Sequence, residues 1–210
     1  MKRKSIIIVV LLSAGIIASW GCGSGPGSPG SSNTEDTGLT VEASIIPSYL
    51  GNNAYSVDVV QQICDEGPPP VFEAFADHGA TVTITARLLN PNAQISPGLL
   101  HIEKYTVEYR RSNDSLGAPP IESDTRFNSI AIAPPIGTGT STVITSAILV
   151  DLLRKEKYLT DVTSGQFSSG LAFINNYTAL YTFEGKNDFG KSFSFKAQAD
   201  FQIGNFDYCP

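Results

Sequence analysis

The chain has 210 residues, of which 41% are hydrophobic and 16% charged, which is enough apolar material for a core and excludes a wholly disordered protein. Its net charge is −6, and it becomes about −9 if Lys2, Arg3 and Lys4 leave with a cleaved leader, because 11 basic residues then face 20 acidic ones. A surface this negative repels phosphate backbones, so no nucleic-acid partner is expected.

The first 22 residues have the pattern of an export signal. Three basic residues precede an apolar run, Ile6–Ala18, and the run ends at Ser19, Trp20, Gly21 and Cys22. The run is too short to span a bilayer but suits a signal peptide. The small residue before Cys22 resembles the lipobox of bacterial lipoproteins, although Leu is usual at the position of Ser19 and Trp20 is unusually bulky.

That resemblance implies cleavage before Cys22 and a lipid on its sulfur, so the membrane is an expected partner. A plain signal peptide with an incidental cysteine is the alternative. Gly23, in place of Asp, implies sorting to the outer membrane.

A Gly-, Ser- and Pro-rich segment, Gly23–Gly38, follows and cannot bury apolar surface. It is predicted to be a flexible tether with a mean reach of roughly 20 Å. The chain therefore divides into a signal peptide (1–21), a lipidated cysteine with its tether (22–38) and a folded domain (39–210).

From Leu39 onward apolar and polar residues alternate, which is typical of strands with one buried and one solvated face. Pro68–Pro70, Pro119–Pro120 and Pro134–Pro135 mark connections, because proline cannot donate to a strand ladder. A short helical turn is possible at Asp151–Glu156. About eight strands are predicted: Leu39–Ile45, Ser56–Ile63, Thr81–Leu88, Lys104–Arg110, Asn128–Ala133, Thr142–Val150, Tyr177–Glu184 and Ser192–Ile203. Such a pattern indicates an all-β sandwich or barrel.

The segment Tyr181–Gly190 resembles the F–G hairpin of immunoglobulin-like domains. Tyr181 takes the place of the corner tyrosine and Asn187–Gly190 that of the turn, whereas Phe183 replaces the usual cysteine and no core tryptophan is present. The resemblance implies an immunoglobulin-like antiparallel β-sandwich and carries no function with it. The extra length is expected in Asp65–Gly79, Ser112–Arg126 and Leu152–Asn176.

With Cys22 assigned to lipid, Cys64 and Cys209 form an even pair in an oxidising compartment and are predicted to form a disulfide. The alternative is a redox-active or metal-binding pair. No CxxC spacing supports it, and His78 and His101 are the two histidines that could add ligands.

Weak cation candidates are Asp65, Glu66 and Asp77, which lie with Glu73 and His78 in one predicted loop, and Asp188 in a predicted turn. Hard cations such as Ca²⁺ need several oxygens. No regular spacing of acidic residues is present, so an ordinary acidic loop is favoured. Two basic groups, Arg110–Arg111 and Arg154–Lys157, are expected to be solvated.

A hydrolase would need a nucleophile, a base and an orienting group. Gly165–Gly170 only loosely resembles G-x-S-x-G, and His78 or His101 would have to lie within hydrogen-bond reach of a serine or carboxylate in a cleft. We therefore expect no catalytic residues, no cofactor and no metal.

The favoured hypothesis is a non-catalytic binding or assembly module of the cell envelope, whose partner is another envelope or secreted protein. The alternative is a secreted hydrolase or carbohydrate-active domain with a site in its loops. A calcium-dependent adhesion domain is a weaker third hypothesis.

Overall fold

The computed structural model describes residues 34–50, 52–92, 96–170, 172 and 174–209. The predicted signal peptide, the lipidated Cys22 and most of the tether lie outside these residues. Within them, no helix combines the length and the apolar character needed to cross a membrane.

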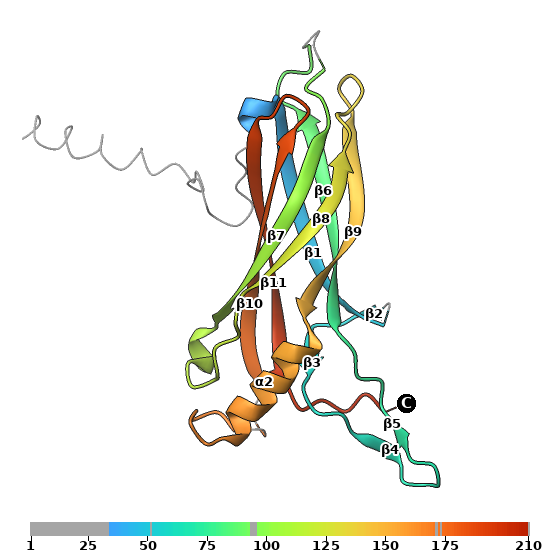
Figure 1. Ribbon diagram of the computed structural model, residues 1–210, viewed down its shortest axis with the longest axis vertical. Helices are drawn as coiled ribbons and strands as arrows, with labels where there is room; N and C mark the ends of the chain where they lie inside the picture. Colours follow the sequence, from blue (N-terminus) through green and yellow to red (C-terminus); the bar gives the residue numbers. More distant parts are fainter. Residues whose placement is uncertain (1–33, 51, 93–95, 171, 173, 210) are drawn as a thin grey trace, which may run out of the picture.

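Two β-sheets make up most of the described chain, so the all-β class is confirmed (Figure 1). The first sheet has the order β2-β1-β6-β9 and the second β3-β11-β10-β7-β8, while β4 and β5 form a separate hairpin. All pairs are antiparallel except β3 with β11. The bounds are β1 Leu39–Tyr49, β2 Asn52–Asn53, β3 Ser56–Asp58, β4 Ile63–Asp65, β5 Val71–Phe72, β6 His78–Leu88, β7 Leu100–Arg111, β8 Asp124–Ile132, β9 Thr140–Val150, β10 Asn175–Asn187 and β11 Ser192–Gly204.

The core lies between the two sheets, because β1, β6, β7, β10 and β11 turn alternate apolar side chains inward. β11 shows the pattern most clearly, as the predicted apolar positions from Phe193 to Ile203 are all buried. Val82 and Ile84 of β6 meet them from the other sheet within one continuous cluster. The period-two alternation thus placed the core face of these strands correctly.

Three tyrosines of the second sheet hold the end of β9 across the core. The register of β9 against β6 shifts at its last residues, which takes Leu149 out of the ladder. Tyr109 OH donates to Leu149 O at 2.5 Å, Tyr181 OH donates to Ile148 O at 2.9 Å, and Ile148 N–H donates to Tyr105 OH at 3.1 Å. Buried backbone groups need such partners wherever the ladder is interrupted.

The predicted β10–β11 turn is confirmed. Asn187 Oδ1 accepts hydrogen bonds from Phe189 N–H and Lys191 N–H at 3.0 and 2.8 Å. Gly190 has φ +75°, which glycine adopts without the steric cost that other residues meet.

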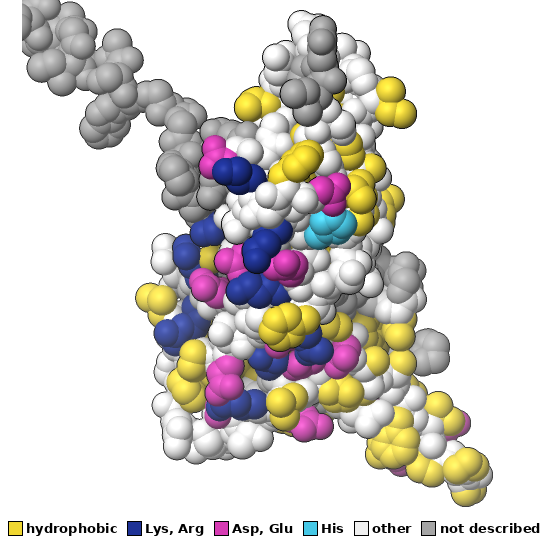
Figure 2. Space-filling view, turned by 45° about the horizontal axis from the view of Figure 1, so that its top comes forward, with side chains coloured by type: hydrophobic (Ala, Val, Ile, Leu, Met, Phe, Trp, Pro, Cys, Tyr) yellow, Lys and Arg dark blue, Asp and Glu magenta, His cyan; other side chains and the backbone are white. Residues whose placement is uncertain are grey.

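The strand predicted over Ser56–Ile63 is wrong in its second half. β3 ends at Asp58, whose Oδ1 accepts from Val60 N–H at 3.3 Å and turns the chain out of the sheet. β4 begins only at Ile63 and pairs with β5, which lies in the segment Asp65–Gly79 that was expected to hold extra length. The resulting hairpin protrudes from the body and carries apolar side chains (Figure 2).

The helical turn predicted at Asp151–Glu156 is a longer helix, α2, which spans Leu152–Thr163. Asp151 caps it by accepting from Arg154 N–H at 3.0 Å. The helix continues because Lys155, Tyr158 and Val162 share one buried face. Ser112–Arg126 contains a short 3-10 helix, η3 (Asn113–Ser115), and a second one, η2 (Glu35–Thr37), precedes β1.

Candidate functional site

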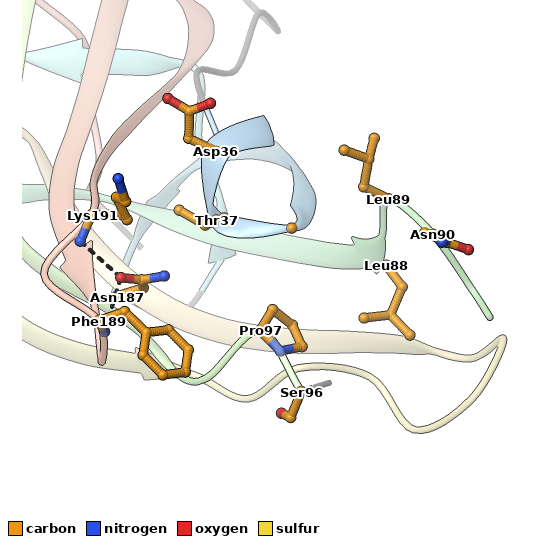
Figure 3. A pocket seen from close by; sticks show the side chains of 11 residues that line it. Asp36, Thr37, Leu88, Leu89, Asn90, Ser96, Pro97, Asn187, Phe189 and Lys191 are labelled. Atoms are coloured by element: carbon orange, nitrogen blue, oxygen red, sulfur yellow. Dashed lines mark hydrogen bonds between the residues drawn. The ribbon is translucent and has the colours of Figure 1, made fainter. Parts of the chain in front are cut away.

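One end of the sandwich carries a pocket of about 390 Å³ between η2, the β6–β7 loop and the β10–β11 turn. Figure 3 shows that apolar side chains, Leu88, Pro97 and Phe189 among them, line it together with polar ones. Its polar side chains come from η2, from the β6–β7 loop and from the turn already described. The pocket has no described histidine or cysteine in its lining.

The two side chains with catalytic potential at this end lie outside that lining. His101 Nε2 and Asp188 Oδ1 are 2.7 Å apart, and Leu99 N–H donates to Asp188 Oδ2 at 2.8 Å. The Leu99 N–H and His101 together lower the pKa of Asp188. The side chains of His101 and Asp188 are 47% and 44% exposed, so water competes with the hydrogen bond between them. His101 therefore meets a carboxylate, as a base would need, but not in a cleft.

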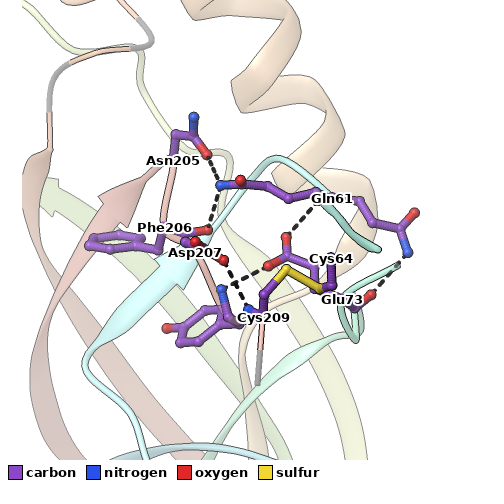
Figure 4. Close-up of a disulfide and its surroundings, with 9 residues drawn as sticks. Gln61, Cys64, Glu73, Asn205, Phe206, Asp207 and Cys209 are labelled. Carbon is purple, nitrogen blue, oxygen red and sulfur yellow. Dashed lines mark hydrogen bonds between the residues drawn. A yellow bond between two sulfur atoms is a disulfide. The ribbon is translucent and has the colours of Figure 1, made fainter. Parts of the chain in front are cut away.

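The opposite end carries the stronger candidate, which we call the clamped hairpin (Ile63–Phe72). Cys64 on β4 is joined to Cys209 by a disulfide, with the Cα atoms 5.3 Å apart, as the cysteine count predicted (Figure 4). The bond connects an early hairpin to a segment that follows the last strand. We call residues 205–209 the C-terminal strap.

Glu73 fastens the hairpin to the strap a second time. Its buried carboxylate accepts from Gln62 N–H at 2.9 Å through Oε1 and from Tyr208 N–H at 2.8 Å through Oε2. Its own N–H donates to Gln62 O at 3.0 Å. Gln62 Nε2 in turn donates to Asn205 Oδ1 at 3.0 Å (Figure 4). Glu73 thus bonds to Gln62, which precedes β4, and to Tyr208 in the strap. The two ends of the hairpin and the strap therefore form one unit.

Asp58 provides a third attachment beneath the hairpin. Its Oδ1 accepts from Phe206 N–H at 2.9 Å as well as from Val60 N–H, while its buried Oδ2 has no hydrogen-bond partner in the described part of the chain. Burial, and to a smaller extent the neighbouring Glu73, raises the pKa of Asp58 to about 6.

A fully buried lysine from α2 faces these acids. Lys155 Nζ donates to Ala76 O at 2.8 Å and lies 4.7 Å from the centroid of the Phe75 ring. Burial lowers the pKa of Lys155 to about 8, while the charges of Asp58, Asp77 and Glu73 act against that shift. The expectation that Arg154–Lys157 is solvated is thus wrong for Lys155, because α2 turns this side chain into the base of the hairpin, although Lys157 is exposed as expected.

Arg154 departs from that expectation in the same way. Its side chain is 15% exposed, and it binds Asp151 Oδ2 at 2.8 Å and Ser123 O at 2.6 Å. Arg126 Nη2 also reaches Asp151 Oδ2, at 2.7 Å. These ion pairs hold α2 against β8 and so fix the position of Lys155.

His78 is buried in the same region and is not positioned as a base. Its Nε2 lies 3.1 Å from Ala54 O, its ring stacks on Tyr49 with centroids 4.8 Å apart, and its Nδ1 has no partner among the described residues. Burial lowers the pKa of His78 to about 4, so the ring is neutral near pH 7. Its described hydrogen bond goes to a backbone carbonyl, not to a serine or a carboxylate.

The predicted acidic residues do not converge on one point. Asp65 Oδ1 accepts from Gly67 N–H at 2.9 Å in the hairpin turn, Asp77 Oδ1 accepts from Leu152 N–H at 2.8 Å, and Glu66 is exposed. Among the described residues, the group of three potential ligand side chains whose atoms lie within 4.8 Å of one another consists of Glu73, Asp207 and Cys209. Because the Cys209 sulfur is in the disulfide, this group offers two carboxylates and no thiolate.

Sequence reasoning missed Asp58, Gln62 and Lys155. The one available signal was the spacing of Lys155, Tyr158 and Val162, which places the three on one helix face. Comparison with family models, curated proteins and solved structures found no match to this chain.

Proposed function

We propose that this protein is a lipoprotein of the bacterial envelope, anchored through Cys22, whose immunoglobulin-like domain binds another envelope or secreted protein through the clamped hairpin. The observation that carries the proposal is that the clamped hairpin protrudes from the body, is held in place by the strap and exposes apolar side chains to solvent. Three of them, Ile63, Val71 and Phe72, are 53%, 51% and 50% exposed.

The order of the long strands supports the immunoglobulin-like assignment. The letters A, B, C, C′, E, F and G can be given in chain order to β1, β6, β7, β8, β9, β10 and β11. One sheet then reads A-B-E and the other G-F-C-C′. Immunoglobulin-like sandwiches divide their strands in this way. Tyr181 bonds to Ile148, before the inserted α2, which departs from the usual corner tyrosine that bonds a few residues upstream.

The hairpin is suited to binding because its shape is fixed before a partner arrives. A two-stranded hairpin alone is marginally stable in water. Here the disulfide, Glu73 and Gln62 attach it to the strap. Little conformational entropy is then lost on association, so the exposed apolar groups contribute fully to affinity.

Its position also suits an anchored protein. η2, where the described chain begins, lies at one end of the long axis and the hairpin lies at the other (Figure 1). A tether leading to η2 would leave the hairpin on the side away from the lipid. Asp65 and Glu66 at the exposed tip favour a partner with an apolar pocket and a basic rim.

Site-specific photo-crosslinking in cells tests the proposal. A photoreactive residue at position 72 is expected to give a discrete adduct with a protein. The same residue at position 144, where Ile144 is 71% exposed on β9, is the matched control and is expected to give none. The absence of an adduct at 72, or an equal one at 144, would refute the hairpin as the contact.

The anchor is tested separately by membrane fractionation of a Cys22→Ala variant. The variant is expected in the soluble fraction of the envelope, because it lacks the residue that carries the lipid anchor. If the variant stays with the membrane, the anchor is elsewhere.

A further inference from the structure

A groove of about 430 Å³ lies on the second sheet, and none of its lining residues belongs to the clamped hairpin. Its polar lining comes from four segments that are distant in sequence: the residue before β3, the stretch from the end of β7 into η3, and the facing ends of β10 and β11. The residues are Tyr55, Ser112, Asp114, Asn176, Asp200 and Gln202.

Amide and carboxylate groups in this groove are held by one another. Asn176 Nδ2 donates to Asp114 Oδ2 at 2.9 Å, and Gln202 Nε2 donates to Asn176 Oδ1 at 3.2 Å. Thr178 Oγ1 and Asp200 Oδ1 are 2.6 Å apart. These hydrogen bonds fix the planes of the side chains. Asp200 Oδ2 and Gln202 Oε1 take no part in them.

An aromatic ring stands beside this network. Tyr55 is 53% exposed, although its backbone is fixed by a 2.7 Å hydrogen bond from Gln202 N–H to Tyr55 O. The ring offers an apolar face and a wet hydroxyl. A ligand that fits has one apolar face and several hydroxyl groups around its edge.

A pyranose ring meets this requirement. Its axial C–H groups present an apolar face to an aromatic ring, and its hydroxyl groups donate to carboxylates and accept from amides. The lining contains two carboxylates and no lysine or arginine, so anionic sugars are disfavoured. We propose that this groove binds a neutral hexopyranose unit of a polysaccharide, stacked on Tyr55 and hydrogen-bonded to Asp200 and Gln202.

Affinity electrophoresis of the full chain in native gels tests this proposal. The gels contain neutral polymers (dextran, amylose or galactomannan) or, as the anionic control, dextran sulfate. At least one neutral polymer is expected to retard the protein, and dextran sulfate is not. Retardation by none of the neutral polymers, or by dextran sulfate equally, would overturn the proposal.

Variants locate the binding. Tyr55→Ala is expected to weaken it about tenfold, because the stacking face is lost. Asp200→Ala is expected to weaken it without altering the ring. Phe127→Ala is the control, because Phe127 is 86% exposed on β8 and outside the groove, and it is expected to bind normally. Normal binding by both groove variants, with their melting temperatures unchanged, would contradict the assignment. The crosslink from position 72 does not depend on this result.

Discussion

Removal of the disulfide is the sharpest test of how the hairpin is held. In a Cys64→Ala, Cys209→Ala variant, the unfolded chain regains the freedom of a loop whose ends are 145 residues apart. The chain-entropy relation gives a loss of about 5 kcal/mol for a loop of that length. The hydrogen bonds of Glu73 and Asp58 to the strap act in the native state and remain possible without the disulfide.

Two measurements on the purified protein check this expectation. Urea denaturation gives the change in the free energy of unfolding, which should be at least about 3 kcal/mol. Amide hydrogen exchange should rise first at Glu73 and Tyr208, whose N–H groups bond within the clamp, while the N–H groups of β10 stay protected. A loss below about 1 kcal/mol, with unchanged exchange at Glu73 and Tyr208, would refute the view that the covalent link braces the arm.

Three further variants probe the acid cluster and the second sheet. Between pH 3.8 and 6 the folded protein keeps a proton on Asp58 that the unfolded chain releases, because burial raises the pKa of Asp58 to about 6. This contribution favours folding at acid pH and is lost as the pH rises through 6. Asp58→Asn should therefore gain stability relative to the parent by about 2 to 3 kcal/mol between pH 4 and pH 7, and a constant difference in urea titrations would disprove this. Gly185→Ala places a Cβ 1.9 Å from His101 O at the β10 bulge and should cost more than about 3 kcal/mol. Gly190→Ala meets no atom within 4 Å and should cost only about 1 kcal/mol for its positive φ, so equal melting temperatures for the two would contradict the steric argument.

The strands were predictable because their information is local. Alternation along Ser192–Ile203 is decided by neighbours two residues apart, and the turn at Asn187–Gly190 is decided by the residues within it. The end of β3 was not predictable, because Asp58 uses its side chain for backbone groups at Val60 and at Phe206, 148 residues away.

The acidic residues illustrate the same limit. Asp65 and Asp77 share one stretch of sequence with Glu73, which suggested a common cation. In the structure each accepts a different backbone N–H, from Gly67 and Leu152 respectively. A carboxylate satisfied by a backbone donor cannot be distinguished from a potential ligand until the donor's position is known. The burial of Lys155 depends likewise on where α2 packs.

The strap delays the completion of the clamped hairpin until after both sheets have been synthesised. Residues 63–72 are synthesised early, yet the atoms that brace them reside at positions 205–209. Both sheets can pair before those positions arrive, because the strap follows β11. A newly made chain would therefore pass through a stage with an assembled body and an unbraced hairpin, which would become braced only after residues 205–209 have been added and Cys64 and Cys209 have been oxidised.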